Sequence, residues 1–239
     1  MQPRPRITVS MILVWMAVAA LAVTSLHLAQ HRAYQVDELE NAYKTRIQAQ
    51  GLQHDFVTNA PLFLIPLQAL IRPDSTSAGV LDHLRLVFVF LMWINVLLIA
   101  RATRAPLRTP LGCGVLLAAA SIAPIWDYGF EIRHDNVLLT GMLAMWCLAK
   151  PNGTAHRYSY VALGALPVLL QLTAFKAFLY YLPLTAACLV FPHPAHRAQH
   201  SLGKLWAQWL LGAGVTFALM FALYQWLDLW TDATLSLHA

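Results

Sequence analysis

Acidic side chains that could do chemistry stand together directly after the first long apolar run of the sequence. Asp37 and Glu38 are adjacent, and they open a polar segment that continues to residue 43. A carboxylate at such a place can take a proton from a hydroxyl group. It can also hold a hard divalent cation such as Mg²⁺ or Mn²⁺. The pair is therefore the first candidate for a catalytic group.

A second acidic group follows about a hundred residues later. Asp135 stands at the start of an apolar run, with Glu131 and Arg133 shortly before it. If both groups lie on one side of a membrane, carboxylates from two loops can share one site. A structural role is the alternative for each. Asp37 with Glu40 matches a capping box, and Asp135 would be favourable at the positive end of a helix dipole.

The composition points to a membrane protein. Of 239 residues, 59% are hydrophobic and 11% are charged, and the mean hydropathy is +0.55. Soluble domains carry about 25% charged residues. The net charge of +5 comes from residues spread among loops, so it does not predict a nucleic-acid partner. The three cysteines lie in apolar runs and are expected to be packing residues.

Apolar runs long enough to cross a bilayer predict an all-α polytopic protein. We expect a single transmembrane domain over residues 1–239, with about seven spans near 7–29, 84–100, 111–125, 136–149, 158–173, 177–191 and 205–227. The first is read as an uncleaved signal anchor. Residues 31–83 form a long outer loop, with an interfacial helix from Leu39 onward and a short apolar segment over 59–71 that is too short to span.

The distribution of basic residues sets the orientation. The short inner segments hold nine arginines and lysines, whereas the short outer segments hold Arg133 and Lys176. The positive-inside rule then places the N-terminus in the cytoplasm. Lys176 is flanked closely by apolar residues, which makes it a candidate for binding a lipid phosphate, or a lysine that reaches to the interface. His193, His196 and His200 are expected in a solvated inner loop.

Several short motifs occur in one order and on one predicted side of the membrane. They are Asp37-Glu38, Asp55-Phe56, Pro61-Leu62-Phe63, Arg133-His134-Asp135 and the run from Lys176 to Pro183. In this order they resemble the polyprenol-phosphate-dependent membrane glycosyltransferases of the GT-C fold, which include protein mannosyltransferases and aminoarabinose transferases. The resemblance covers nearly the whole chain.

The resemblance implies roles for these residues. Asp37, with Glu38 beside it and Asp135 in support, would activate an acceptor hydroxyl for attack on the anomeric carbon, so that the sugar is transferred with inversion. Arg133 and Lys176 would face the donor phosphate, and Glu131 and Asp55 would lie near the substrate. The donor would be a polyprenyl-phosphate-linked sugar in the inner (cytoplasmic) membrane. Asp135 would help to hold a metal where a family member uses one.

Two other functions are weighed against transfer. Full-length members of the family have further spans and often an outer C-terminal domain, so a partner protein is expected to supply that part. The chain could then be a non-catalytic subunit or a truncated paralogue that binds or translocates lipid-linked sugar. A transporter is disfavoured, because transporters place polar groups at the midplane in broken helices, whereas these acidic groups cluster at one predicted surface.

Overall fold

A computed structural model describes residues 9–49, 61–71, 76–107, 109–122, 126, 128–151 and 156–227. The secondary-structure elements in these ranges are all helices, and none is a strand. They are α1 (Val9–His31), α2 (Val36–Ala49), α3 (Pro61–Gln68), α4 (Ser77–Ala102), α5 (Pro110–Ala120), α7 (His134–Ala149), α8 (Ser159–Thr173), η2 (Phe175–Ala177), α9 (Phe178–Val190), α10 (Pro194–Arg197) and α11 (Leu202–Trp226).

Three of these helices are long and apolar enough to cross a membrane, namely α1, α4 and α11. This confirms the helical class for the described residues, with three helices whose length and composition suit a membrane span. Each of the other four expected spans also coincides with a helix, since α5, α7, α8 and α9 lie within or close to the expected ranges. These helices have 11 to 16 residues. That they cross the membrane stays a prediction.

The chain divides into two compact units. The first contains residues 1–42 and 73–136, and the second contains residues 43–72 and 137–239. The boundaries fall inside α2 and α7, so each of these helices contributes residues to both units. The single membrane domain expected from the sequence stays a prediction.

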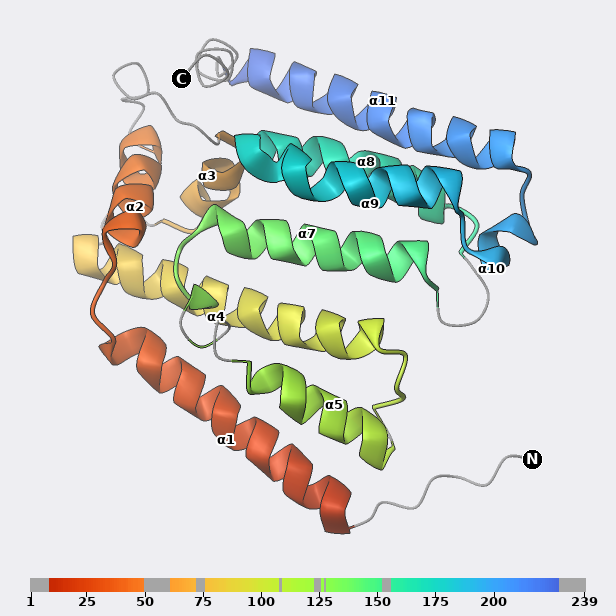
Figure 1. Ribbon diagram of the computed structural model, residues 1–239. Coiled ribbons are helices and arrows are strands. Elements are labelled where there is room, and N and C mark those ends of the chain that lie inside the picture. The colour runs from red at the N-terminus through yellow and green to blue at the C-terminus, as the bar shows by residue number, and fades with distance from the viewer. Residues whose placement is uncertain are drawn as a thin grey trace. The chain divides into compact units, whose positions relative to one another are not determined.

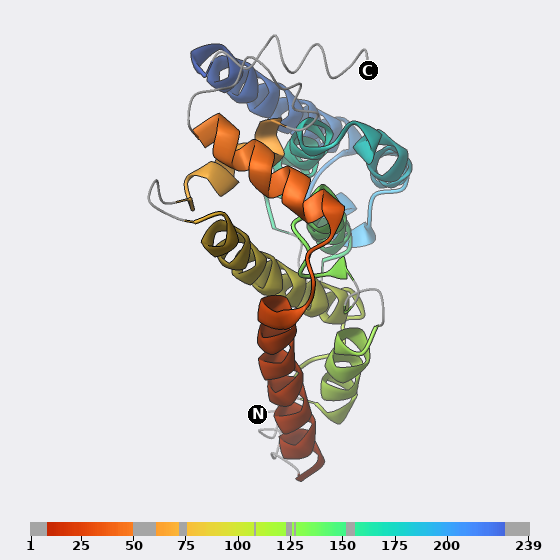
Figure 2. The ribbon, with the colours of Figure 1, turned by 90° about the vertical axis from the view of Figure 1, so that its left-hand side faces the viewer.

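The first unit is built on α1, α4 and α5, which pack against one another (Figures 1 and 2). Threonines begin two of these helices. The hydroxyls of Thr76 and Thr109 accept hydrogen bonds from the amides of Gly79 and Gly112, at 3.1 Å in both cases, and so satisfy orphan donors at the helix starts. The buried core is Val18, Ala29, Val89, Met92, Val96, Ala100, Leu116, Ala119, Ala120 and Phe130.

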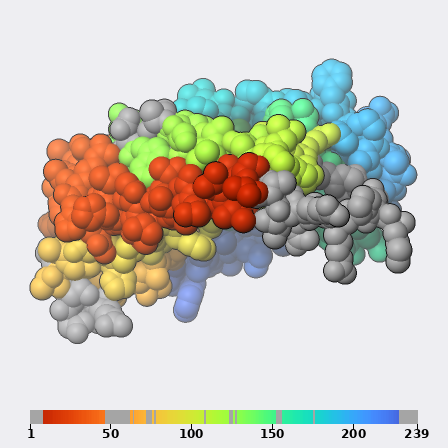
Figure 3. Space-filling model, turned by 90° about the horizontal axis from the view of Figure 1, so that it is seen from below, coloured from red at the N-terminus to blue at the C-terminus, as the bar shows by residue number. Residues whose placement is uncertain are grey.

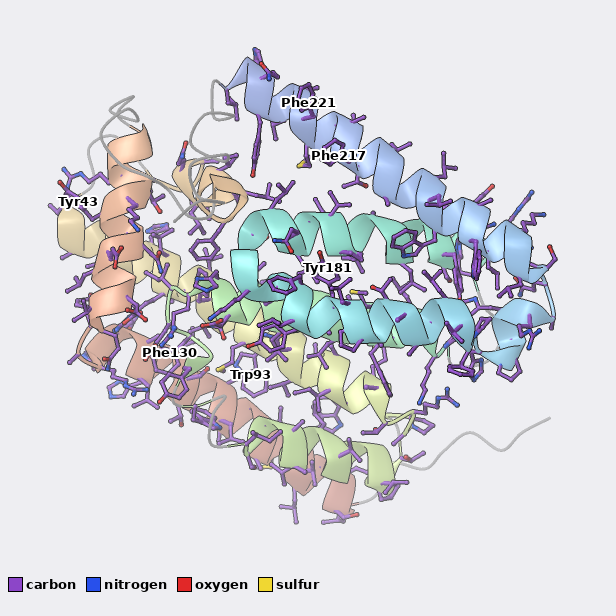
Figure 4. The ribbon with its side chains drawn as sticks, turned by 45° about the horizontal axis from the view of Figure 1, so that its top comes forward. Tyr43, Trp93, Phe130, Tyr181, Phe217 and Phe221 are labelled. Atoms are coloured by element: carbon purple, nitrogen blue, oxygen red, sulfur yellow. The ribbon has the colours of Figure 1, made fainter. Side chains whose placement is uncertain are left out.

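Outside this core, α1 presents apolar side chains to its surroundings. Val9, Leu13 and Met16 are more than half exposed, and the helix lies uncovered in the space-filling view of Figure 3. On its other side, Ser25 accepts a hydrogen bond from the indole of Trp93 on α4 at 3.0 Å; Trp93 is labelled in Figure 4. An exposed apolar face on a helix of this length is what a lipid environment requires.

The second unit is organised by close packing of α11 on α8, which Figure 1 shows side by side. Glycine allows the approach. A Cβ atom on Gly164 would collide with the carbonyl of Trp209, and one on Gly212 would collide with the carbonyl of Val161. The two glycines therefore form reciprocal contact points, as small residues do where membrane helices pack.

Aromatic side chains add to this unit (Figure 4). The hydroxyl of Tyr181 on α9 donates to the side-chain oxygen of Gln171 on α8 at 3.0 Å. Phe217 and Phe221, both on α11, stack with ring centroids 6.5 Å apart. Both side chains are more than a third exposed, so their rings lie on the exposed face of α11.

The expectation of solvated histidines is wrong for His196. Its side chain is buried, and its ring Nε2 lies 2.9 Å from the carbonyl oxygen of Leu148. Burial lowers the pKa of His196. The edge of the ring meets Tyr160, with centroids 5.0 Å apart, so His196 packs α10 against neighbouring helices.

Cys113 and Cys188 are buried and Cys147 is partly buried, all as free thiols, in agreement with a packing role.

Candidate functional site

The candidate site lies wholly in the first unit and begins at the start of α2. Glu38 is the third residue of this helix, and its Oε2 accepts a hydrogen bond from the backbone amide of Gln35 at 3.0 Å. This is the return bond of a capping box. The expected box, with Asp37 as the cap and Glu40 as its partner, is thus displaced by two residues. Asp37 is inside the first turn, where the positive end of the helix dipole stabilises its negative charge.

Glu38 is buried completely and is paired with an arginine from α4. Its two carboxylate oxygens accept from Arg85 Nε at 2.9 Å and from Arg85 Nη2 at 2.6 Å. The amide of Ile132 points to the same carboxylate at 3.4 Å. Glu38 is therefore a structural anchor. The sequence analysis grouped Glu38 with Asp37 as catalytic. Because Glu38 is completely buried and paired with Arg85, its role in the structure is to hold α2 in place.

Arg85 uses all its donors. Besides Glu38, its guanidinium donates to the carbonyl oxygens of Ala29 at 3.0 Å, Arg32 at 2.6 Å and Ala33 at 3.1 Å. Ala29 is in the last turn of α1, where the final acceptors of a helix have no partner within it, and Arg32 and Ala33 follow in the link to α2. The guanidinium also lies 4.1 Å from the ring centroid of Tyr34. One buried side chain thus fixes the end of α1 and the start of α2.

Sequence reasoning missed Arg85 because it stands within an otherwise apolar segment that was assigned as a span. A signal was present. An arginine next to hydrocarbon requires an anionic or carbonyl partner, and Glu38 is one of the acidic residues that could have been considered. The pairing joins positions 47 residues apart, and no local spacing pattern predicts it.

Arg133 brings three carboxylates together. Its Nη2 lies 3.2 Å from Asp37 Oδ2 and 3.5 Å from Asp135 Oδ2, and its Nη1 lies 3.6 Å from Glu131 Oε2. Asp37 and Asp135 therefore meet at one nitrogen atom, as expected from their predicted sidedness. The side chains of Asp37 and Asp135 are 55% and 39% exposed, and that of Arg133 is 30% exposed. They can be reached by a substrate.

Glu131 differs from these two carboxylates because its side chain is only 1% exposed. Among the residues that the structure describes, neither of its oxygens has a hydrogen-bond partner, and Arg133 lies at an ion-pair distance of 3.6 Å. Burial, and next the negative charge of Glu38, raise the pKa of Glu131. A direct contact between Glu131 and a substrate, as the resemblance implies, does not fit this burial.

Hydrogen bonds from two asparagines fasten the segment that carries Arg133. The side-chain amide of Asn41 on α2 donates to the carbonyl of Ile132 at 2.7 Å. The side-chain amide of Asn136 donates to the backbone carbonyls of Tyr128 and Glu131, both at 2.9 Å. These bonds satisfy backbone acceptors that irregular structure leaves open. The segment is thus fixed both to α2 and to itself, which positions Arg133.

The link between α1 and α2 is held at a further point. The hydroxyl of Tyr34 donates to Asp82 Oδ1 on α4 at 2.6 Å, and this hydrogen bond raises the pKa of Tyr34. Arg32 donates to the carbonyl of Trp126 at 3.3 Å, and its guanidinium lies 5.6 Å from the ring centroid of Phe130, which is labelled in Figure 4.

The residues present do not fit a divalent cation. Among the residues that the structure describes, no group of three His, Cys, Asp or Glu side chains could hold a metal ion. The guanidinium of Arg133 stands where a cation shared by Asp37 and Asp135 would have to bind. The positive charge at this point is thus supplied by the chain itself.

The remaining expected site residues are placed elsewhere or are not described. Lys176 is an exposed residue of η2, in the second unit. Asp55 and Phe56 lie outside the described residues, whereas residues 61–63 form the start of α3. The roles of Lys176 and Asp55 stay predictions.

Comparisons of the chain with protein-family models, with curated proteins and with solved structures gave no match.

Proposed function

We propose that this chain is a membrane glycosyltransferase, or the N-terminal module of one, that transfers a sugar from a polyprenyl-phosphate carrier to an acceptor in the cell envelope. The observation that supports this most is the meeting of Asp37 and Asp135 at Arg133, in a unit built on two of the long apolar helices. Accessible carboxylates beside a cation are the groups that such a transfer needs, a base and a stabiliser of a phosphate leaving group.

In the proposed reaction, Asp37 takes the proton of an acceptor hydroxyl as its oxygen attacks the anomeric carbon. The bond from this carbon to the phosphate oxygen breaks, and the lipid phosphate leaves with the electron pair. Attack opposite the leaving group inverts the anomeric carbon. Arg133 stabilises the charge that develops on the phosphate, and Asp135 holds Arg133.

The proposal includes a topology. All seven apolar helices cross the membrane, the N-terminus is cytoplasmic, α2 lies at the outer interface, and the membrane is the inner (cytoplasmic) one. The proposed orientation rests on the distribution of basic residues between the expected spans.

The experiment is a transfer assay with the purified full chain and a panel of polyprenyl-phosphate-linked sugars. Asp37→Asn should reduce transfer by at least a hundredfold, since a positioned base contributes about 10²–10⁴ in rate. Glu40→Gln is the control, because Glu40 is an exposed acid on the same helix. Transfer that is unchanged by Asp37→Asn would remove Asp37 from the mechanism.

A non-catalytic carrier-binding subunit is the alternative, and one observation favours it. Asp37 is already ion-paired with Arg133 at 3.2 Å, which neutralises part of the charge that a base would use. This function predicts binding of polyprenyl-phosphate-linked sugar with no turnover in any preparation. Binding should then be lost in Lys176→Ala.

A further inference from the structure

The first unit contains two buried carboxylates whose surroundings are opposite. Glu38 is charge-paired and accepts hydrogen bonds from Arg85 and from the amide of Gln35. Glu131 is almost as completely buried, and within the described part of the chain its oxygens accept no hydrogen bond and have only the ion pair with Arg133 at 3.6 Å. A buried ionised carboxylate is strongly disfavoured unless donors surround it, whereas a protonated carboxyl is not. The two residues therefore call for different protonation states.

The charges that face Glu131 do not remove this difference. Arg133 is the nearest, at 3.6 Å, but its guanidinium is shared with Asp37 and Asp135. From the link that follows α1, Arg32 is a further positive charge near Glu131, and it donates to the carbonyl of Trp126. From α4, Arg85 is saturated by Glu38 and by backbone carbonyls.

From α2, Glu38 adds a negative charge near Glu131. The amide of Ile132, the residue next to Glu131, is directed to the Glu38 carboxylate at 3.4 Å. The donor closest in sequence is thus used by the other carboxylate. Burial and the charge of Glu38 together raise the pKa of Glu131, against smaller opposing effects of Arg133 and Arg32.

We propose that Glu131 holds a proton at neutral pH and is a positioning residue. While Glu131 is protonated and neutral, Arg133 stays paired with Asp37 and Asp135. Loss of that proton to the solvent creates a carboxylate that competes for the same guanidinium. Arg133 is then drawn toward Glu131, and Asp37 is released from its ion pair. The part of this inference that concerns turnover rests on the proposed function, but the protonation state does not.

The direct test is infrared difference spectroscopy on the purified full chain in lipid. The carbonyl stretch of a protonated carboxyl is separate from the carboxylate bands. At pH 7 we expect a protonated-carboxyl band that is absent in Glu131→Gln and unchanged in Glu40→Gln. If wild type has no such band at pH 7, or if Glu131→Gln retains it, the inference is overturned.

A titration of the wild-type chain keeps the test valid if Glu131→Gln fails to fold. The band should decline as the pH is raised, with a midpoint well above the ordinary glutamate value of 4.5. A midpoint below neutral pH overturns the inference, because Glu131 would then be mostly ionised at pH 7. No substrate is present in either measurement, so a negative transfer assay would count against the proposed function and not against the protonation of Glu131.

Discussion

Arg85 and Glu38 form a buried ion pair whose worth depends on both partners being present. Their side chains are 1% and 0% exposed, and each is fully hydrogen-bonded. Removal of one partner from a buried pair leaves an uncompensated charge, whereas replacement of both by apolar residues is often neutral. The ion pairs of Arg133 are partly exposed, and each is worth at most about 1 kcal/mol. Arg85 therefore supports the fold, and Arg133 is free to serve a site.

Arg85→Met should destabilise the chain by about 3–5 kcal/mol, because Glu38 loses its partner. Arg101→Met is the matched control, since Arg101 is an exposed arginine on the same helix. The double replacement of Arg85 and Glu38 by methionine should recover the part of the loss that comes from the unpaired Glu38 charge, but not the part from the carbonyls of Ala29, Arg32 and Ala33. Unfolding in detergent measures this, and equal effects of the two single arginine variants would contradict it.

Glu131→Gln should change how stability depends on pH. The folded-state pKa of Glu131 is raised by burial, so its favourable contribution is complete below the unfolded-state pKa and is lost as the pH rises through the folded-state pKa. The variant lacks this loss. Its melting temperature should therefore increase relative to wild type between pH 4 and pH 8, and a constant difference across that range would refute the expectation.

At the scale of elements, glycine decides how closely α8 and α11 pack. Gly212 faces the backbone of Val161, whereas Gly214, two residues later on α11, has open space where a Cβ atom would stand. The same substitution thus has opposite expected effects at two neighbouring positions.

Gly212→Ala should destabilise the second unit by about 1–3 kcal/mol through overpacking. Gly214→Ala should be neutral or stabilise it by up to about 1 kcal/mol, because alanine is the better helix former. Thermal unfolding of both variants in one detergent compares them. A larger loss in Gly214→Ala than in Gly212→Ala would disprove the packing account.

The sequence was informative about helices and less so about their exact starts. Apolar runs predict the positions of α1, α4 and α11, because lipid exposure demands continuous apolar segments. The capping box of α2 was misplaced by two residues, and its helix begins at Val36 instead of Leu39. Gln35 is not a usual capping residue, and the pattern Asp37 to Glu40 matched the motif more closely.

Among site residues, a shared site for Asp37 and Asp135 was a hypothesis from their predicted sidedness, with helix capping as the alternative, and the structure brings both to Arg133. The pairing of Glu38 with Arg85 and the burial of Glu131 were not. Both depend on tertiary contacts between segments 47 or more residues apart, and a sequence read in order carries no local pattern for them.

At the scale of the whole molecule, orientation in the membrane is the open expectation with the clearest test. If α1 enters from the cytoplasm, α2 is outside and the segment that follows α4 is inside. Glu40→Cys should then react with a membrane-impermeant thiol reagent in intact cells, whereas Thr103→Cys should react only after permeabilisation. The reverse pattern would invert the topology.

The central claim is that Asp37 and Asp135 share one site at Arg133, and short-range crosslinking tests it most directly. In a background with the three native cysteines replaced by serine, Asp37→Cys is combined with Asp135→Cys and treated in membranes with a short bifunctional thiol reagent. Glu40→Cys with Asp135→Cys is the control pair. We predict efficient crosslinking of the first pair and little of the second. Absence of a crosslink between positions 37 and 135 would contradict the shared site.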